Sequence, residues 1–210
     1  MPPAPSRVRK RDRTSAHLSR IAFELFDKSG YAAVSMEQIA EAAGVSKVTL
    51  YKYFPFKEAL VAHRFREEIA TGMKAFEAKF DSGEPFESAM RKLLAASAAW
   101  NESRRELMPH YLRFRFSDAG SNARFGSGTS QIVESLFRRA QNRGEIRADV
   151  PAEELARMFE MLCLGAVVSW LKDQRPALKR RFQMALDLTL HGASQRPKAR
   201  RRINTQRNSK

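Results

Sequence analysis

The chain has 210 residues, 43% of them hydrophobic, and a formal net charge of +15. These values are typical of a globular protein with one large domain or two small ones, and the positive charge favours a polyanionic partner, either nucleic acid or a membrane surface. Cys163 is the single cysteine, which excludes an intramolecular disulfide and favours a reducing, cytoplasmic location.

Most of the positive charge lies at the two ends of the chain. Residues 1–13 hold five basic residues and one acidic residue, and residues 192–210 hold seven basic residues and no acidic one. Three of the first five residues are prolines. We therefore predict a disordered basic arm at residues 1–13 and a disordered basic tail at residues 193–210.

The first helix is predicted directly after the arm. Thr14 or Ser15 can cap its N-terminus, and the apolar residues that follow have the i, i+3, i+4, i+7 spacing of an amphipathic helix. Gly30 suits the position just beyond its C-terminus, where the backbone is often left-handed.

Two short helices joined by a tight turn come next. Ser35, with a glutamine three residues later, forms a capping-box pattern at the start of the second helix, and Gly44 ends that helix. Ser46 can cap a third helix that continues to about Tyr53. This arrangement is typical of a helix-turn-helix motif, whose second helix enters the major groove of DNA. We therefore predict a helix-turn-helix DNA-binding domain at residues 14–56.

The third helix begins with the residue types that a reading helix needs. The major groove displays hydrogen-bond donors, acceptors and thymine methyl groups. Ser46, Lys47, Val48 and Thr49 supply short polar groups, a cation and methyls near the helix N-terminus, whose free N–H groups also favour phosphate. Pro55 then separates this helix from the rest of the chain.

Beyond Pro55 the apolar spacing predicts helices only. They are expected over residues 57–80, 86–103, 107–117, 132–143, 152–172 and 176–191, with a Gly-, Ser- and Asn-rich loop at residues 117–127. No segment alternates apolar and polar residues as a half-buried strand would. The predicted fold class is therefore all-α, a three-helix helix-turn-helix domain followed by a helical bundle at residues 57–192.

Residues 14–61 resemble the head of the TetR family of bacterial transcriptional regulators. The matching positions lie in all three helices and their turns: Ile21-Ala22, Leu25-Phe26, Gly30-Tyr31, Ser35-Met36, Ile39-Ala40, Ala43–Lys47, Thr49–Tyr51, Tyr53-Phe54, Lys57-Glu58 and Leu60. The resemblance implies a homodimer, expected to be a repressor, whose two heads bind the half-sites of a palindromic operator. It also implies that residues 57–192 form a ligand-binding and dimerisation domain, and that a small effector bound there releases the DNA through the connecting helix at residues 57–80.

The resemblance places the DNA contacts on the second and third helices. They are Ser46, Lys47, Val48, Thr49, Tyr51, Lys52, Tyr53 and Lys57, with Ser35 at the phosphate backbone. Lys52 and Lys57 would neutralise phosphates without reading sequence. Val48 stands where glycine is frequent in the family, and it could contact a thymine methyl. Leu50 and Phe54 are expected to face inward.

An aromatic and methionine-rich set supplies candidate effector contacts in the predicted bundle. Small apolar ligands bind in pockets lined by such side chains and a few polar groups. The candidates are Trp100, His110, Tyr111, Phe114, Met158, Met161 and Leu162, although a helical domain also needs residues of these types as plain core. Because few buried charges are evident, a neutral or lipophilic effector is expected.

The helix at residues 152–172 is apolar on more than one face, so it must be covered on several sides. Pairing with residues 176–191 across a two-fold axis would cover the second face, and Gly165 would permit close approach. We therefore predict a homodimer through residues 152–191, with Leu164 and Val168 in the interface.

Other function classes find little support. The four histidines are scattered without metal-ligand spacing and no nucleophile motif occurs, so neither an enzyme nor a metal or other cofactor is expected. The apolar run at residues 161–168 is far shorter than the roughly 18 residues that span a bilayer, so no membrane segment is expected and the protein would be cytoplasmic and nucleoid-associated. The alternative is a helix-turn-helix protein that acts architecturally or through a protein partner, without a small-molecule ligand.

Overall fold

The computed structural model describes residues 7–79, 83–117 and 130–192, and every regular element in these ranges is an α-helix. The helices are α1 (Arg7–Ser29), α2 (Met36–Ala42), α3 (Lys47–Tyr53), α4 (Lys57–Lys79), α5 (Phe86–Ser103), α6 (Met108–Arg115), α8 (Ser130–Asn142), α9 (Ala152–Lys172) and α10 (Leu178–His191). The predicted all-α fold class is confirmed for the described part of the chain.

Helix α1 is longer than the sequence pattern predicted. It begins at Arg7, so residues 7–13 are helical and the prediction of a disordered arm is wrong for them. Thr14 is not an N-cap either, because its Oγ1 donates to the carbonyl of Lys10, one turn earlier in the same helix, at 3.0 Å. Arginine and lysine are good helix formers, which lets the helix extend into the basic segment. The remaining part of the arm and the predicted tail at residues 193–210 lie outside the described residues.

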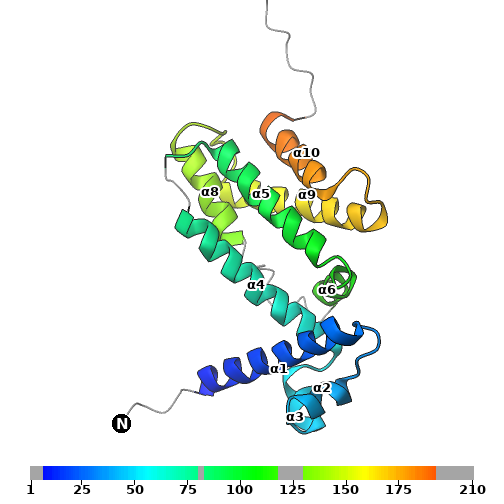
Figure 1. The fold of residues 1–210 in the computed structure, drawn as a ribbon. Coiled ribbons are helices and arrows are strands. Elements are labelled where there is room, and N and C mark those ends of the chain that lie inside the picture. Colours follow the sequence, from blue (N-terminus) through cyan, green and yellow to red (C-terminus); the bar gives the residue numbers. More distant parts are fainter. Residues whose placement is uncertain (1–6, 80–82, 118–129, 193–210) are drawn as a thin grey trace, which may run out of the picture.

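Helices α1, α2 and α3 form the head, which lies at the lower end of the molecule in Figure 1. The predicted capping box is present, since Gln38 N–H donates to Ser35 Oγ at 3.2 Å and Ser35 N–H donates to Gln38 Oε1 at 2.8 Å. Gly44 has a φ of +66° in the turn between α2 and α3, a conformation that favours glycine. Leu18 and Leu50 are fully buried, so α1 and α3 share one small core.

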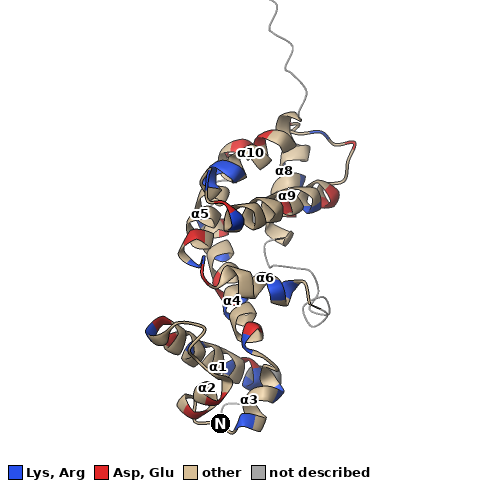
Figure 2. Ribbon diagram, turned by 90° about the vertical axis from the view of Figure 1, so that its right-hand side faces the viewer, with Lys and Arg blue, Asp and Glu red and all other residues tan. Residues whose placement is uncertain are grey.

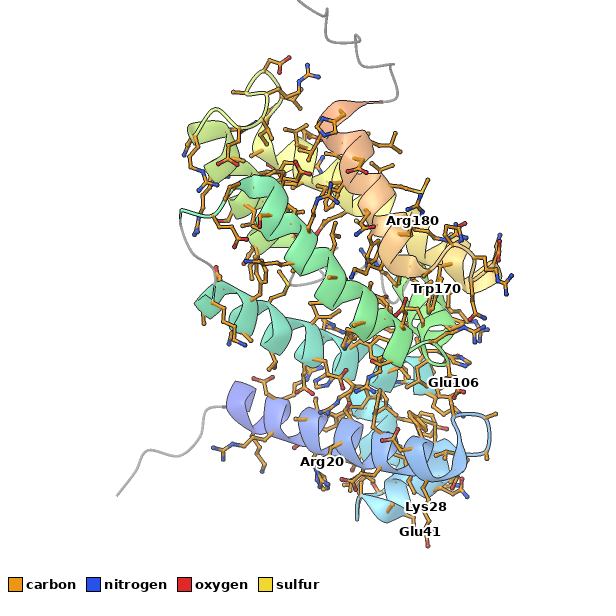
Figure 3. The ribbon with its side chains drawn as sticks, turned by 45° about the horizontal axis from the view of Figure 1, so that its top comes forward. Arg20, Lys28, Glu41, Glu106, Trp170 and Arg180 are labelled. Atoms are coloured by element: carbon orange, nitrogen blue, oxygen red, sulfur yellow. The ribbon has the colours of Figure 1, made fainter. Side chains whose placement is uncertain are left out.

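Helix α4 runs from the head to the bundle, and α6 lies beside it where the two parts meet (Figure 1). The bundle consists of α5, α8, α9 and α10, in which α9 packs against both α8 and α10 and α10 packs against α5. Trp170 is buried where α9 lies beside α10 (Figure 3). Helix α4 therefore connects the head to the bundle.

Helix α10 begins at Leu178 rather than at Pro176. The Arg181 guanidinium donates to the carbonyls of Asp173, Arg175 and Pro176 at 2.9, 2.9 and 3.1 Å. These carbonyls are turned toward a side chain of the helix that follows, which keeps the segment before Leu178 out of the helix. Among the described helices, none has both the length and the apolar character needed to cross a bilayer.

Candidate DNA-binding head and effector cavity

Helix α3 lies at the lower end of the molecule (Figure 2). The predicted reading residues at positions 46–49 are exposed, except for the half-buried Thr49. Val48 is 81% exposed, the highest value among the exposed large hydrophobic residues. Tyr51 and Lys52 are also exposed. Val48 has no packing role that would explain its apolar side chain, so the side chain is free to contact a ligand such as a base edge.

The first turn of α3 is held by its cap. Ser46 Oγ accepts from Thr49 N–H at 3.1 Å and lies 2.9 Å from Thr49 Oγ1. Lys47 Nζ lies 3.4 Å from Glu37 Oε1 across the turn, with both side chains well exposed. A backbone hydrogen bond and the Lys47 charge hold the pKa of Glu37 below its ordinary value. Such an exposed pair is weak, so Lys47 is available to a phosphate.

The inward orientation predicted for Leu50 and Phe54 is confirmed, because both side chains are buried. Tyr53 is half-buried and packs against the core. Ser35 is exposed at the start of α2, although its hydroxyl already serves the capping box.

Lys57 has a structural role that the sequence did not predict. Its Nζ donates to the carbonyl oxygens of Tyr31 and Val34, both at 2.6 Å, and lies 4.1 Å from the centroid of the Tyr31 ring. Burial lowers the pKa of Lys57, an effect that the neighbouring Glu58 opposes. The ammonium thus fastens α4 to the turn between α1 and α2, and a contact between Lys57 and a phosphate stays a prediction that this geometry does not support.

A cavity of about 270 Å³ lies in the bundle, with walls from α4, α5, α6, α8, α9 and α10. This volume is near the lower end of the range of about 300–1,000 Å³ typical of small-molecule sites. Its lining is mostly apolar, and it includes Trp100 and Tyr111 from the predicted set. It also includes residues that sequence reasoning missed, above all the face of α4 from Glu68 to Phe76.

Glu68 is the best-compensated charge in this lining. Its carboxylate accepts from Trp100 Nε1, from Arg104 Nε and Nη2 and from Arg64 Nε, each at 3.0 Å. Burial alone would raise the pKa of Glu68, but the hydrogen bonds from Arg104 and Trp100 outweigh it and hold the pKa below its ordinary value. The carboxylate therefore stays ionised and ties α4 to the end of α5.

Cys163 also lines the cavity, on α9. Burial, with a smaller contribution from Glu160, raises the pKa of the Cys163 thiol to about 12. A neutral thiol is a poor nucleophile, so Cys163 serves here as a small apolar wall residue. The described residues contain no cluster of histidine, cysteine and carboxylate side chains that could hold a metal ion.

Two predicted effector contacts lie at the junction with the head instead. The rings of His110 and Tyr31 are stacked with centroids 3.8 Å apart and planes at 29°. Phe114 packs against Phe56 with ring centroids 5.8 Å apart. His110 and Phe114 are not part of the cavity lining, so their assignment as effector contacts stays a prediction that the cavity does not support.

Three further predicted contacts lie on the outside of the bundle. Met158 is 66% exposed, and Met161 and Leu162 are also exposed, whereas Phe159 and Val167 on the same helix line the cavity. The spacing i, i+3, i+4 places the three exposed residues on one face of α9. They lie outside this cavity, so their assignment as effector contacts stays a prediction that the cavity lining does not support. Together with the exposed Met184 and Leu188 of α10 we call them the exposed apolar face.

Comparison with known proteins shows which family the chain is similar to. The family model described as "Bacterial regulatory proteins, tetR family" matches residues 20–63. The transcriptional repressor KstR of Mycolicibacterium smegmatis is 30% identical over 176 residues, which are 81% of this chain and 83% of KstR. The chain belongs to the TetR family. It is therefore a DNA-binding transcriptional regulator, with the helix-turn-helix motif at α2 and α3.

Other transcriptional regulators are similar to this protein over most of the chain. The transcriptional regulator MftR of Mycobacterium tuberculosis, whose name refers to mycofactocin biosynthesis, is 29% identical over 193 residues, 89% of this chain and 94% of MftR. The crystal structure of Thermus thermophilus FadR, a repressor in complex with lauroyl-CoA, has a similar fold with a TM-score of 0.75 at 22% identity, covering 87% of this chain and 96% of that one. FadR of Bacillus subtilis in complex with stearoyl-CoA has a TM-score of 0.63 at 18% identity, covering 85% and 99%.

Proposed function

We propose that this protein is a repressor that binds a palindromic operator as a homodimer and leaves it when a small lipophilic effector enters the cavity. The observation that carries the proposal is the position of α4. Its first residue, Lys57, is bonded to the head, and its later turns, from Glu68 to Phe76, line the cavity. A ligand that displaces the later turns of α4 would therefore move the head.

The proposed DNA contacts are exposed residues of the motif, together with the half-buried Thr49 and Tyr53. They are Ser46, Lys47, Val48, Thr49, Tyr51, Lys52 and Tyr53, with Ser35 at a phosphate. Val48 and Tyr51 support this assignment best, because both are large and exposed without a structural reason. The cationic and hydroxyl groups around them are of the kinds that contact phosphates.

An effector with an acyl chain is the class that we propose for the cavity. The lining is largely aromatic and aliphatic, and two proteins of similar fold are described in complex with lauroyl-CoA and stearoyl-CoA. KstR, the curated relative, is named as a repressor, which supports repression rather than activation.

Footprinting on the DNA that flanks the protein's own gene tests this proposal. We expect one short protected inverted repeat, and we expect the protection to disappear when an acyl effector is added. The Val48→Glu variant, run beside the wild type without effector, is a control that should protect nothing. Broad protection without a preferred site, insensitive to any acyl compound, would instead support an architectural DNA-binding protein.

A further inference from the structure

Arg115 is the one cation that lines the cavity in the described part of the chain. Its guanidinium forms no ion pair or side-chain hydrogen bond with any described residue. The other charged lining residues have partners, since Glu68 binds Arg64 and Arg104, and Glu160 accepts from Ser130 Oγ at 3.0 Å. Among the described residues, Arg115 thus differs from the other charged lining residues in having no partner for its charge.

An unpaired guanidinium beside apolar walls favours an anionic ligand group. Removing a charge from water without a partner is costly, and Arg115 is only partly exposed. The planar guanidinium matches a carboxylate or phosphate with two parallel hydrogen bonds, which are among the stronger hydrogen bonds in proteins. The cavity therefore combines an apolar chamber with one fixed positive group.

Arg115 also lies on the helix that joins the cavity to the head. It is the last residue of the eight-residue α6. The same helix carries Phe114, which packs on Phe56, and Arg113, whose Nη1 lies 3.4 Å from Glu58 Oε1 at the start of α4. A ligand that binds Arg115 and shifts it would therefore also shift Phe114 and Arg113, which contact residues at the start of α4 beside the head.

We propose that Arg115 binds the anionic group of an amphipathic effector whose alkyl part fills the cavity, and that α6 passes this contact to the head. The proposal rests on the proposed function and names the class of effector and the residue that selects it. The anion can be the carboxylate of a free acid or a phosphate of an acyl thioester, and Arg115 can pair with either.

Four probes with the same alkyl chain separate these possibilities: decanoate, decanol, decyltrimethylammonium and decanoyl-CoA. Calorimetry on the full-length protein gives the dissociation constant of each. We expect at least one anionic probe to bind about 10- to 100-fold more tightly than decanol, as hydrogen bonds to a charged group would give. A preference for decanoate identifies a carboxylate, and a preference for decanoyl-CoA identifies the phosphates.

The Arg115→Gln variant should lose this preference, and Arg115→Lys should keep part of it. Arg105→Gln is the matched control, since Arg105 is exposed, has the same charge and does not line the cavity. Thermal unfolding of each variant checks that it is folded. If Arg115→Gln does not fold, the binding preference of Arg115→Lys still tests the proposal. Equal binding of decanol and the anions, an unchanged preference in Arg115→Gln, or binding of no probe would overturn the inference.

DNA binding without any probe is measured in parallel for all variants. If the wild type fails to bind the flanking DNA, the proposed function fails whatever the calorimetry shows. If it binds DNA but ignores the charge of the probe, the proposed function stands and the assignment of Arg115 falls.

Discussion

Lys57 and Lys52 have the same charge and lie five positions apart, but the fold uses them differently. Lys52 points to solvent on α3, while the ammonium of Lys57 holds two carbonyls from the turn between α1 and α2. Replacing Lys57 with methionine keeps the apolar stem and removes both hydrogen bonds. We expect the free energy of unfolding, measured in urea, to fall by about 1–3 kcal/mol, as for other bonds from charged donors.

The Lys52→Met variant is the control for charge. It should keep the stability of the wild type but lower the slope of log affinity against log salt by about 1 for each phosphate that Lys52 neutralises in the wild type. Lys57→Met should leave that slope nearly unchanged once the protein is folded. Equal destabilisation of both variants would show that the hydrogen bonds from Lys57 to the two carbonyls contribute nothing.

Val48 is the residue through which this head can differ in specificity from relatives with glycine at that position. Its exposed methyls can contact a thymine methyl in the major groove. In a binding assay on single-base operator variants, Val48→Ala should relax the preference at one base pair by about 1 kcal/mol, a modest share of the usual 1–3 kcal/mol per pair. The other positions serve as internal controls, and an unchanged profile would exclude the contact.

The sequence could predict α3 but not Lys57, for a physical reason. Helix caps and inward-facing residues such as Ser46 and Leu50 depend on neighbours within one or two turns, which the local pattern contains. The partners of Lys57 are carbonyls of residues 31 and 34, brought close only by the packing of α1 against α4. A lysine without a visible local partner therefore resembles a surface lysine.

At the scale of elements, α6 is the joint between the head and the bundle. Its His110 stacks on Tyr31, and its Nδ1 has no hydrogen-bond partner in the described part of the structure. Burial lowers the pKa of His110, the charges of Arg113 and Lys57 lower it further, and Glu58 opposes them. The stack is therefore formed with a neutral imidazole.

This depressed pKa makes the fold sensitive to acid. As the pH falls through the ordinary histidine value of 6.5, the unfolded chain takes up a proton before the folded one, so stability is full above that pH and decreases below it. We expect the melting temperature to drop between about pH 7.5 and about pH 5.5. The His110→Phe variant keeps an aromatic ring on Tyr31 and removes the titrating group, so its melting temperature should drop less than that of the wild type.

His63 contributes in the same direction, because burial lowers its pKa too, against the opposing charge of Glu67. Some acid sensitivity should therefore remain in His110→Phe. Calorimetric melting of both proteins at the two pH values checks this. The role of His110 would be contradicted by a wild type with the same melting temperature at both pH values. It would also be contradicted by a variant whose melting temperature drops as much as that of the wild type.

The predicted effector contacts that lie outside the cavity show what periodicity cannot decide at this scale. His110 and Phe114 have the residue types of a pocket lining, and only the position of α6 beside the head gives them another role. The apolar stripe of α4 is visible in the sequence, but a stripe does not say whether it covers core or lines a cavity. Which neighbour covers which face is a property of the packed molecule.

At the scale of the whole molecule, α9 has two apolar faces with different partners. Phe159 and Val167 face the cavity, and Met158, Met161 and Leu162 face outward. The sequence predicted correctly that more than one face of this helix is apolar, but the effector contacts predicted on it lie on the face that does not line the cavity. An exposed apolar face of this kind usually marks a protein interface.

The exposed apolar face is where we place the two-fold contact of the homodimer. Leu164, which we predicted from sequence to lie in the interface, also lines the cavity, so a polar substitution there would act on the cavity as well as on a dimer contact. Met161 on α9 and Leu188 on α10 are better choices, because both are exposed and α9 packs against α10. In a two-fold interface each substitution is present twice.

Met161→Glu and Leu188→Glu should each convert the dimer to monomers in sedimentation velocity. Burial of one such side chain contributes about 2 kcal/mol, so removing two copies weakens association by about 4 kcal/mol, roughly a thousandfold in the dissociation constant. Phe116→Glu is the control, since Phe116 is exposed directly after α6 and is not part of the exposed apolar face, and it should remain dimeric. The monomeric variants should still bind a single operator half-site, but their affinity for the full palindrome should fall to that of a half-site, because the two heads are no longer joined. A dimer that persists in both variants would place the interface on another surface.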